Sequence, residues 1–201
     1  MGLDLPEAAQ QQLLRYLALL EKWNKAYNLS AVRNINDMLN RHLLDSLSVL
    51  TYIEQATPQR FIDVGTGGGL PGIPLAIVLP HWHWTLLDSN GKKTRFLTEV
   101  KAQLALTNVT VVNSRVELYR PEQAMDGVIS RAFASLSDMI TECEHLLTES
   151  GAFWAMKGQY PEQELQQIPK PYQLMQSWPL QVAGESGERH LLKLSACNNK
   201  N

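Results

Sequence analysis

The chain has 201 residues, 44% of them hydrophobic, and a formal net charge of −2. This length is enough for one sizeable core, which favours one compact unit with a small extension over several domains. The chain has no overall excess of basic residues, whereas such an excess is common in proteins that bind bare nucleic acid. Cys143 and Cys197 lie far apart without paired spacing, so we predict neither a disulfide framework nor a metal site.

No secretory or membrane signal is apparent in the sequence. The N-terminal residues show no basic region followed by an apolar stretch, and the longest apolar run, 73–79, is far too short to span a bilayer. We therefore expect a cytoplasmic protein without a membrane partner.

The first 57 residues predict an N-terminal helical extension. Apolar residues recur at helical spacing from Leu13 to Tyr27 and again from Leu39 to Ile53, which indicates two amphipathic helices. We predict Asn36 as the N-cap of the second helix and Thr57-Pro58 as its stop. Residues 22–41 carry a local charge of +3, as do residues 92–101.

Residues 61–72 predict a strand that turns through glycines into a helix. Gly65 and Gly67 have no Cβ and can adopt positive φ, so a ligand can approach the backbone and the start of the helix. About twenty residues later, a second apolar strand ends in Asp88, a position where a carboxylate binds the vicinal hydroxyls of a ribose. Together the two segments predict a nucleotide-like cofactor.

Two cofactors are compatible with this turn. The run from Gly67 to Gly72 formally satisfies the dinucleotide pattern, which would indicate NAD. However, Asp63 precedes the first glycine, and its carboxylate would repel a pyrophosphate but attract the sulfonium and ammonium of S-adenosylmethionine. The methyl donor therefore fits Asp63, Gly65, Gly67 and Asp88 better.

Beyond residue 57, strand and helix patterns alternate, which predicts a doubly wound, mostly parallel α/β sheet. The expected strands are 60–64, 83–87, 109–113, 127–130 and 152–156, and the expected helices are 71–79, 91–106, 137–148 and 161–167. Residues 172–182 and 189–195 predict a closing antiparallel hairpin. This Rossmann-like layout is typical of class I methyltransferases, with residues 58–201 as the methyltransferase domain.

The ends of the later strands supply further candidate residues. Val116 and Glu117 follow the third strand and are placed to line an adenine, one by packing and the other by accepting from its amine. Arg131 follows the fourth strand, where a methyltransferase meets its substrate. The alternative for Glu117 is an ordinary helix start.

The absence of two catalytic features limits which kind of atom can accept the methyl group. Residues 130–135 lack the Asn/Asp-Pro-Pro-aromatic motif of exocyclic-amine methyltransferases, and neither cysteine is placed as a nucleophile. A ring nitrogen with a free lone pair, such as guanine N7, remains and needs no general base. We therefore predict catalysis by positioning alone, with no catalytic acid or base and with Arg131 as the best candidate at the reaction centre.

The chain resembles the ribosomal RNA small subunit methyltransferase G family, once called glucose-inhibited division protein B. The matching segments cover nearly the whole chain in order: 22–29, 41–46, 61–67, 69–74, 86–89, 129–135, 157–158 and 187–191. The resemblance implies methyl transfer from S-adenosylmethionine, with S-adenosylhomocysteine as product, to N7 of one guanine in the decoding-region stem-loop of bacterial 16S ribosomal RNA. It also implies cofactor contacts at Gly65, Leu70, Val116, Glu117 and Arg131.

We expect the partner to be 16S ribosomal RNA within the small subunit or an assembly intermediate, bound by a monomer. Polar and basic side chains of the matching segments and basic clusters are candidates for the RNA-facing rim: Asn28, Arg41, His42, Lys92, Arg95, Lys157 and Arg189. A local helix hydrogen-bond network is the alternative for His42, Asp45 and Ser46. The competing functions are methylation of a small molecule or protein, nicotinamide-dependent oxidoreduction, and RNA binding without catalysis.

Overall fold

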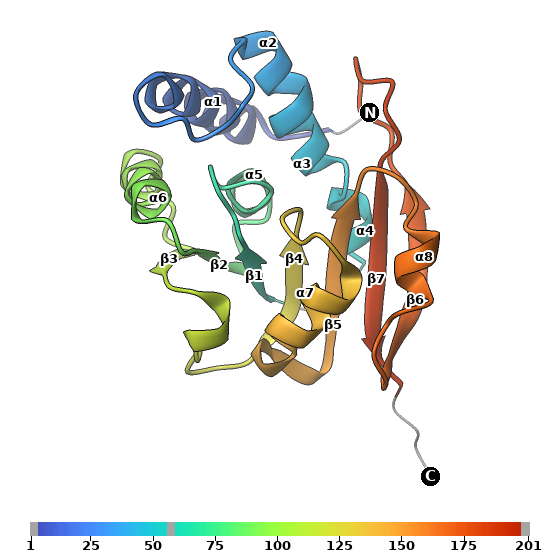
Figure 1. Ribbon diagram of the computed structural model, residues 1–201. Coiled ribbons are helices and arrows are strands. Elements are labelled where there is room, and N and C mark those ends of the chain that lie inside the picture. Colours follow the sequence, from blue (N-terminus) through green and yellow to red (C-terminus); the bar gives the residue numbers. More distant parts are fainter. Residues whose placement is uncertain (1–3, 56–58, 198–201) are drawn as a thin grey trace.

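A seven-stranded sheet with helices on both faces forms the body of the computed structural model, which describes residues 4–55 and 59–197 (Figure 1). The strand order is β3-β2-β1-β4-β5-β7-β6. Five strands are parallel: β1 Arg60–Val64, β2 His83–Asp88, β3 Val109–Asn113, β4 Met125–Ser130 and β5 Leu147–Lys157. The last two, β6 Tyr172–Pro179 and β7 His190–Ala196, form an antiparallel hairpin whose β7 pairs with β5. The predicted fold class is confirmed.

The order in which successive strands are added to the sheet changes direction between the neighbouring strands β1 and β4. From β1 the order runs outward through β2 and β3 on one side, and through β4 and β5 on the other. In open α/β sheets, ligands bind at the carboxyl ends of the strands beside such a reversal. The loops after β1 and β4 are therefore the expected location of a cofactor and its substrate.

Helices cover the sheet because each presents an apolar stripe to it. On one face lie α1 Glu7–Tyr27, α5 Gly72–Val78 and α6 Gly91–Gln103, packed on a core that includes Phe61, Trp84 and Trp154. On the other face, α7 Leu136–Cys143 packs on Ile62, Val128 and Phe153. Short helical turns complete this side: η2 Val116–Leu118, η3 Glu144–Leu146 and α8 Glu162–Leu165.

Two strands begin earlier than predicted. β4 starts at Met125 and β5 at Leu147, and the helix predicted over 137–148 therefore ends sooner. The first residues of β5 are half-buried or exposed, whereas residues 151–156 are buried. Only the buried part of this strand carries the apolar pattern from which a strand is predicted.

The second N-terminal helix differs most from its prediction. Residues 35–47 are continuously helical but change type, from α2 Ile35–Met38 through the π-helical turn η1 Leu39–Leu44 to α3 Asp45–Leu47, and a turn at 48–49 separates them from α4 Leu50–Ile53. The N-cap is Asn34 rather than Asn36, because the Asn34 side chain accepts from the backbone N–H of Asn36 at 2.8 Å. The predicted stop at Thr57-Pro58 lies outside the described residues.

Helix α1 is joined to the glycine turn by a buried hydrogen bond. The Tyr16 hydroxyl donates to the Gly68 carbonyl at 2.7 Å, and burial raises the pKa of this phenol above its ordinary value. Buried side chains of α1 also belong to the same hydrophobic cluster as those of α5 and α6.

The division of the chain at residues 57 and 58 stays a prediction. In the described part of the chain, no helix has both the length and the apolar character that crossing a membrane requires.

Replacing Tyr16 with Phe tests the coupling between α1 and the glycine turn. The variant leaves the buried Gly68 carbonyl without its donor, so we expect the free energy of unfolding to fall by about 1–2 kcal/mol. Urea denaturation measures this change. Tyr27→Phe, an exposed tyrosine on the same helix, is the matched control and should unfold like the parent protein. Equal stability of the two variants would show that the Tyr16 hydrogen bond contributes nothing.

Candidate active site

A buried carboxylate organises the turn after β1. One oxygen of Asp63, Oδ2, accepts from the Thr66 hydroxyl at 2.7 Å and from the backbone N–H of Gly72, the first residue of α5, at 2.8 Å. The side chain is fully buried, and its other oxygen, Oδ1, has no hydrogen-bond partner among the residues that the structure describes. Asp63 thereby connects the end of the strand, the glycine turn and the start of the helix.

Burial makes Asp63 a weak acid. Desolvation raises its pKa to about 6, against the opposing effects of the bonds from Thr66 and Gly72 and of the nearby Arg131 guanidinium. An unpartnered buried oxygen on such a group favours a positive charge in its neighbourhood. This agrees with the preference for a cationic cofactor that the sequence indicated.

The second predicted carboxylate, Asp88 at the end of β2, is hydrogen-bonded to the glycine turn. Asp88 Oδ2 accepts from the backbone N–H of Gly67 at 2.9 Å and lies 3.5 Å from Lys93 Nζ, while Oδ1 accepts from the backbone N–H of Asn90 at 2.8 Å. Gly67 has a φ of +60°, and a Cβ added there would meet no atom closer than 3.9 Å. Space is therefore open beside the turn, next to a carboxylate already held in place.

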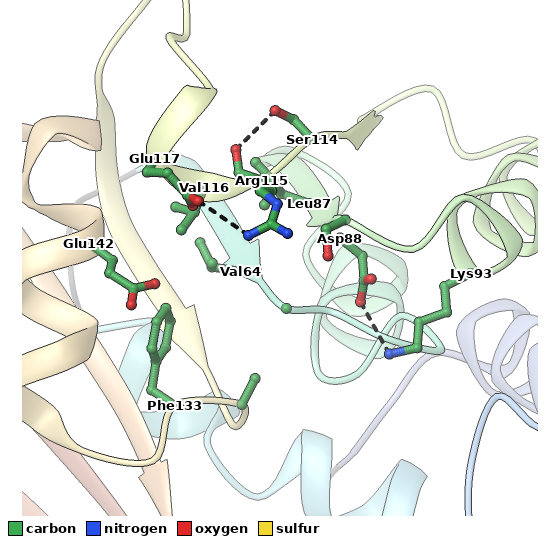
Figure 2. Close-up of a pocket in the computed structure, with 13 residues that line it drawn as sticks. Val64, Leu87, Asp88, Lys93, Ser114, Arg115, Val116, Glu117, Phe133 and Glu142 are labelled. Atoms are coloured by element: carbon green, nitrogen blue, oxygen red, sulfur yellow. Dashed lines mark hydrogen bonds and ion pairs between the residues drawn. The ribbon is translucent and has the colours of Figure 1, made fainter.

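A cavity of about 340 Å³ opens at this edge of the sheet (Figure 2). In Figure 2, Asp88 and Lys93 lie on one side of it and Phe133 and Glu142 on the other. Gly65, with a φ of +70°, is part of its wall, and a Cβ there would lie 2.6 Å from Ala132 Cβ. The turn after β1 therefore requires glycine where it approaches the loop after β4.

Only some of the predicted cofactor residues line this cavity. Gly65, Asp88, Val116 and Glu117 line it. Asp63 and the buried Leu70 lie beneath the turn, Gly67 contributes its N–H to Asp88, and Arg131 lines a neighbouring cavity. Prediction from the sequence missed several lining residues: Ser89, Lys93, Ser114, Arg115, Phe133 and Glu142. Most of these residues lie close in sequence to predicted ones, whereas nothing in the sequence around Glu142, on α7, indicates a binding site.

The hydrogen-bond acceptors and the size of this cavity fit S-adenosylmethionine. Each oxygen of the Asp88 carboxylate keeps a lone pair for a ribose hydroxyl, because a carboxylate can accept about four hydrogen bonds. Val116 offers an apolar surface for an adenine, and the exposed carboxylate of Glu117 can accept from its amine. The volume lies within the range of about 300–1,000 Å³ for small-molecule sites.

A second cavity, of about 390 Å³, gathers basic residues from distant parts of the chain. Its lining includes Arg41 from η1, Arg131 after β4, Lys157 at the end of β5, and Arg189 with His190 at the start of β7. Arg131 is adjacent in sequence to Ala132, which lines the first cavity. The loop that follows β4 therefore contributes residues to both cavities.

Three of the predicted RNA-facing residues, Arg41, Lys157 and Arg189, meet in this second cavity. Lys157 Nζ already donates to the carbonyls of Phe133 and Ala134 at 3.3 and 3.2 Å and forms an ion pair with Glu164 at 2.9 Å. Its ammonium therefore holds the loop after β4 in place.

The other predicted RNA-facing residues lie elsewhere. Asn28 is the left-handed C-cap of α1 and accepts from Arg33, and Lys92 and Arg95 are exposed on α6. His42 is buried with Nε2 2.6 Å from the Ser30 hydroxyl, and burial is the largest of the effects that lower its pKa. A neutral, buried imidazole does not bind phosphate, so the local-network alternative describes His42 better.

The cysteines take no part in either cavity. Cys143 is buried in α7, where desolvation raises its pKa to about 12, and Cys197 is exposed after the end of β7. A thiol with so high a pKa supplies no thiolate near neutral pH. Neither cysteine lines either of the two cavities, so neither is placed there as a nucleophile.

Asp88→Asn tests the predicted ribose ligand. We expect at least a tenfold loss of affinity for S-adenosylhomocysteine, or about 1.4 kcal/mol, because the neutral amide offers one acceptor in place of two. Thermal shift at fixed ligand concentration reports the loss. Asp126→Asn removes a carboxylate paired with Arg60 at the amino end of the sheet and should keep the full shift. An unaltered shift in Asp88→Asn would exclude Asp88 as the ribose ligand.

The raised pKa of Asp63 predicts pH-dependent cofactor binding. Below about pH 6 its carboxyl is protonated and no longer attracts a cation, so affinity for S-adenosylmethionine should fall as the pH drops from 7.5 to 5. S-adenosylhomocysteine, which lacks the sulfonium charge, should show a smaller fall, and Asp63→Asn should flatten both. Calorimetric titration across this range measures the slopes. The same slope in Asp63→Asn as in the parent protein would contradict the assignment.

Comparison with known proteins agrees with this geometry. The family model described as GidB, rRNA small subunit methyltransferase G, matches residues 9–192. The ribosomal RNA small subunit methyltransferase G of Saccharophagus degradans is 54% identical over 199 residues, which cover 99% of this chain and 88% of the relative.

Solved structures show the same fold at low sequence identity. TrmN from Thermus thermophilus is 17% identical with a TM-score of 0.61, covering 79% of this chain and 53% of that chain. TYW2 of M. jannaschii, solved in complex with AdoMet, is 14% identical with a TM-score of 0.55, covering 76% of both chains. The family model and the curated relative span nearly the whole sequence, and the chain therefore belongs to the rRNA small subunit methyltransferase G family.

Proposed function

We propose that this chain transfers the methyl group of S-adenosylmethionine to N7 of one guanine in the decoding-region stem-loop of bacterial 16S ribosomal RNA. The observation that carries the proposal is that adjacent residues at the end of β4, Arg131 and Ala132, line two cavities of different character. One offers the Asp88 carboxylate to a ribose, and the other offers Arg41, Arg131 and Arg189 to an anionic polymer.

Guanine N7 suits this site because its attack requires no proton transfer. The only carboxylate that lines the second cavity among the described residues is Asp45, and both of its oxygens are bound to arginines. It is therefore not free to act as a general base. S-adenosylmethionine supplies the electrophilic methyl group, and the protein contributes in-line alignment, a positioning effect of about 7–11 kcal/mol in favourable cases.

Each candidate residue has a role in this proposal. Asp88, Val116 and Glu117 hold the nucleoside of the cofactor, with the glycine turn approaching it closely at Gly65. Asp63, Gly67 and Leu70 shape that turn, and Arg131 lies at the reaction centre. Arg41 and Arg189 contact RNA phosphates, and Asn28, Lys92 and Arg95 form an outer rim for more distant parts of the RNA. Lys157 supports the loop after β4.

The natural substrate is proposed to be the small ribosomal subunit or an assembly intermediate in the cytoplasm, acted on by a monomer. A guanine in folded RNA is usually stacked, so it must be exposed or flipped before it enters the cavity. The basic surface is modest, because each of the two basic segments has a charge of only +3. Shape and neighbouring ribosomal proteins would then supply part of the recognition.

Transfer of radiolabelled methyl tests this function directly. The protein is incubated with labelled S-adenosylmethionine and either small subunits or protein-free 16S RNA, both from cells that lack this modification, and nucleosides are then analysed. We expect label in 7-methylguanosine, with more on subunits than on free RNA. Label in another nucleoside would overturn the N7 assignment, and label in neither RNA would refute the proposed acceptor.

A further inference from the structure

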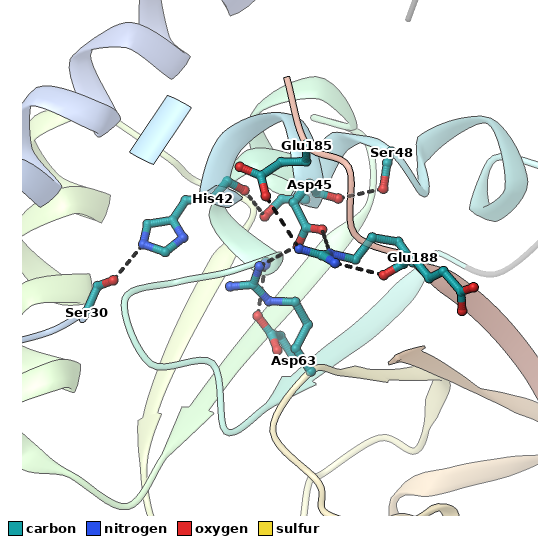
Figure 3. A network of polar contacts seen from close by, with 11 residues as sticks. Ser30, His42, Asp45, Ser48, Asp63, Glu185 and Glu188 are labelled. Atoms are coloured by element: carbon teal, nitrogen blue, oxygen red, sulfur yellow. Dashed lines mark hydrogen bonds and ion pairs between the residues drawn. The ribbon is translucent and has the colours of Figure 1, made fainter. Parts of the chain in front are cut away.

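Asp45 joins two arginines from distant parts of the chain. Its Oδ2 lies 2.7 Å from Arg131 Nη1, and its Oδ1 lies 3.2 Å from Arg189 Nε. Arg131 follows β4, Arg189 directly precedes β7, and Asp45 begins α3. Figure 3 shows Asp45 at the centre of this network, between Glu185 and Asp63. One carboxylate therefore sets the positions of the arginine at the reaction centre and of an arginine on the RNA side.

The π-helical turn before Asp45 determines where this carboxylate points. The Asp45 N–H bonds back to the Asn40 carbonyl, five residues earlier, and such wide turns occur frequently at functional sites. The hydroxyls of Ser46 and Ser48 donate at 2.6 Å to the carbonyls of His42 and Asp45 respectively. The local-network interpretation thus holds for Ser46, whereas the Asp45 side chain reaches away from its helix.

The Asp45 side chain is only 8% exposed and those of Arg131 and Arg189 are 26% and 29% exposed. Each Asp45 oxygen is bound to a different guanidinium. Glu185 adds a second carboxylate 3.1 Å from Arg41 and 3.8 Å from Arg189, but no contact with Arg131 is found in the described part of the chain. The carboxylate that restrains Arg131 is therefore Asp45.

We propose that Asp45 is a positioning residue for methyl transfer, which prevents Arg131 from closing its fork on guanine N7. This inference rests on the proposed function. A free arginine binds guanine through both O6 and N7, the commonest arginine–guanine contact, and that geometry would occupy the lone pair that must attack the methyl group. The bond from Nη1 to Asp45 fixes the orientation of the Arg131 guanidinium, so that its remaining N–H groups can donate to O6 without covering N7. Adenine, which presents a donor amine in place of O6, is rejected.

Asp45→Asn gives this proposal a kinetic signature. The substitution removes the negative charge while keeping the shape, and it releases both guanidinium groups toward the RNA. We expect kcat for methylation of small subunits to fall at least tenfold while KM for the subunit stays level or falls. The dependence of RNA binding on salt should steepen by about one unit of log–log slope, because one more cation becomes available to phosphate.

A purely structural role would give a different result. Loss of folding would lower the apparent kcat and also abolish stabilisation by S-adenosylhomocysteine, whereas Asp45 lies outside the cofactor cavity and its positioning role leaves that stabilisation intact. Asp126→Asn, which also removes a carboxylate paired with an arginine, is the matched control and should keep the parent kinetics. A kcat for Asp45→Asn within twofold of the parent, or a lowered kcat that is accompanied by lost cofactor stabilisation, would overturn the proposal.

Two further variants identify the arginine through which Asp45 acts. Arg131→Lys replaces the planar guanidinium with a point charge and loses the oriented contact with O6, so its kcat should fall as in Asp45→Asn, and the double variant should be no slower than the slower single one. Asp45→Glu keeps the charge and should recover part of kcat. Additive losses in the double variant would contradict action through Arg131 and would refute the proposal even if Asp45→Asn proved poorly folded.

The parent protein separates failure of this inference from failure of the proposed function. If it forms 7-methylguanosine on small subunits and Asp45→Asn does so equally fast, only the role of Asp45 is wrong. If the parent protein forms no 7-methylguanosine, the proposed function fails, and the role of Asp45 fails with it.

Discussion

The buried carboxylate of Asp63 is the constraint on which the site depends. Its Oδ2 binds the Thr66 hydroxyl and the first N–H of α5, so the strand end, the glycine turn and the helix start move as one unit. Burying this charge is costly, and the two hydrogen bonds offset part of that cost. Once the turn is held, the Gly67 N–H reaches Asp88 and the cofactor cavity takes its shape.

Charge separation, rather than net charge, gives the protein its two binding surfaces. The overall charge of −2 hides a cavity edge near Asp63 and Asp88, where we propose that the cofactor binds, and a second cavity with several arginines, where we propose that RNA binds. Arg131 lies between the two sides, close enough to Asp63 to affect its pKa and bound directly to Asp45. An acidic protein can therefore still present a local surface for RNA, because screened charges act over about 10 Å rather than over the whole molecule.

Much of the fold could be predicted because each buried strand and helix carries its own periodic pattern. The glycine turn, Asp88 and the residues after β3 were found for the same reason, since each follows a strand that is visible in the sequence. The π-helical turn at Leu39–Leu44 was not found, because the helix continues through it with apolar spacing that suits an α-helix, and only the hydrogen-bond pattern makes it a π turn. Asn34 was missed as N-cap because Asn36 has the same capping chemistry two residues later.

The sequence by itself determined the parallel sheet, its closing hairpin and the strand ends near which a cofactor site forms, because those features depend on local apolar patterns and on glycines. Tertiary structure alone decided which charged groups meet. Arg41, Arg131 and Arg189 come from different elements, and Asp45 and Glu185 reach them across long sequence separations. Local sequence patterns do not predict such contacts, because the contacts form only after the helices and the hairpin have packed on the sheet.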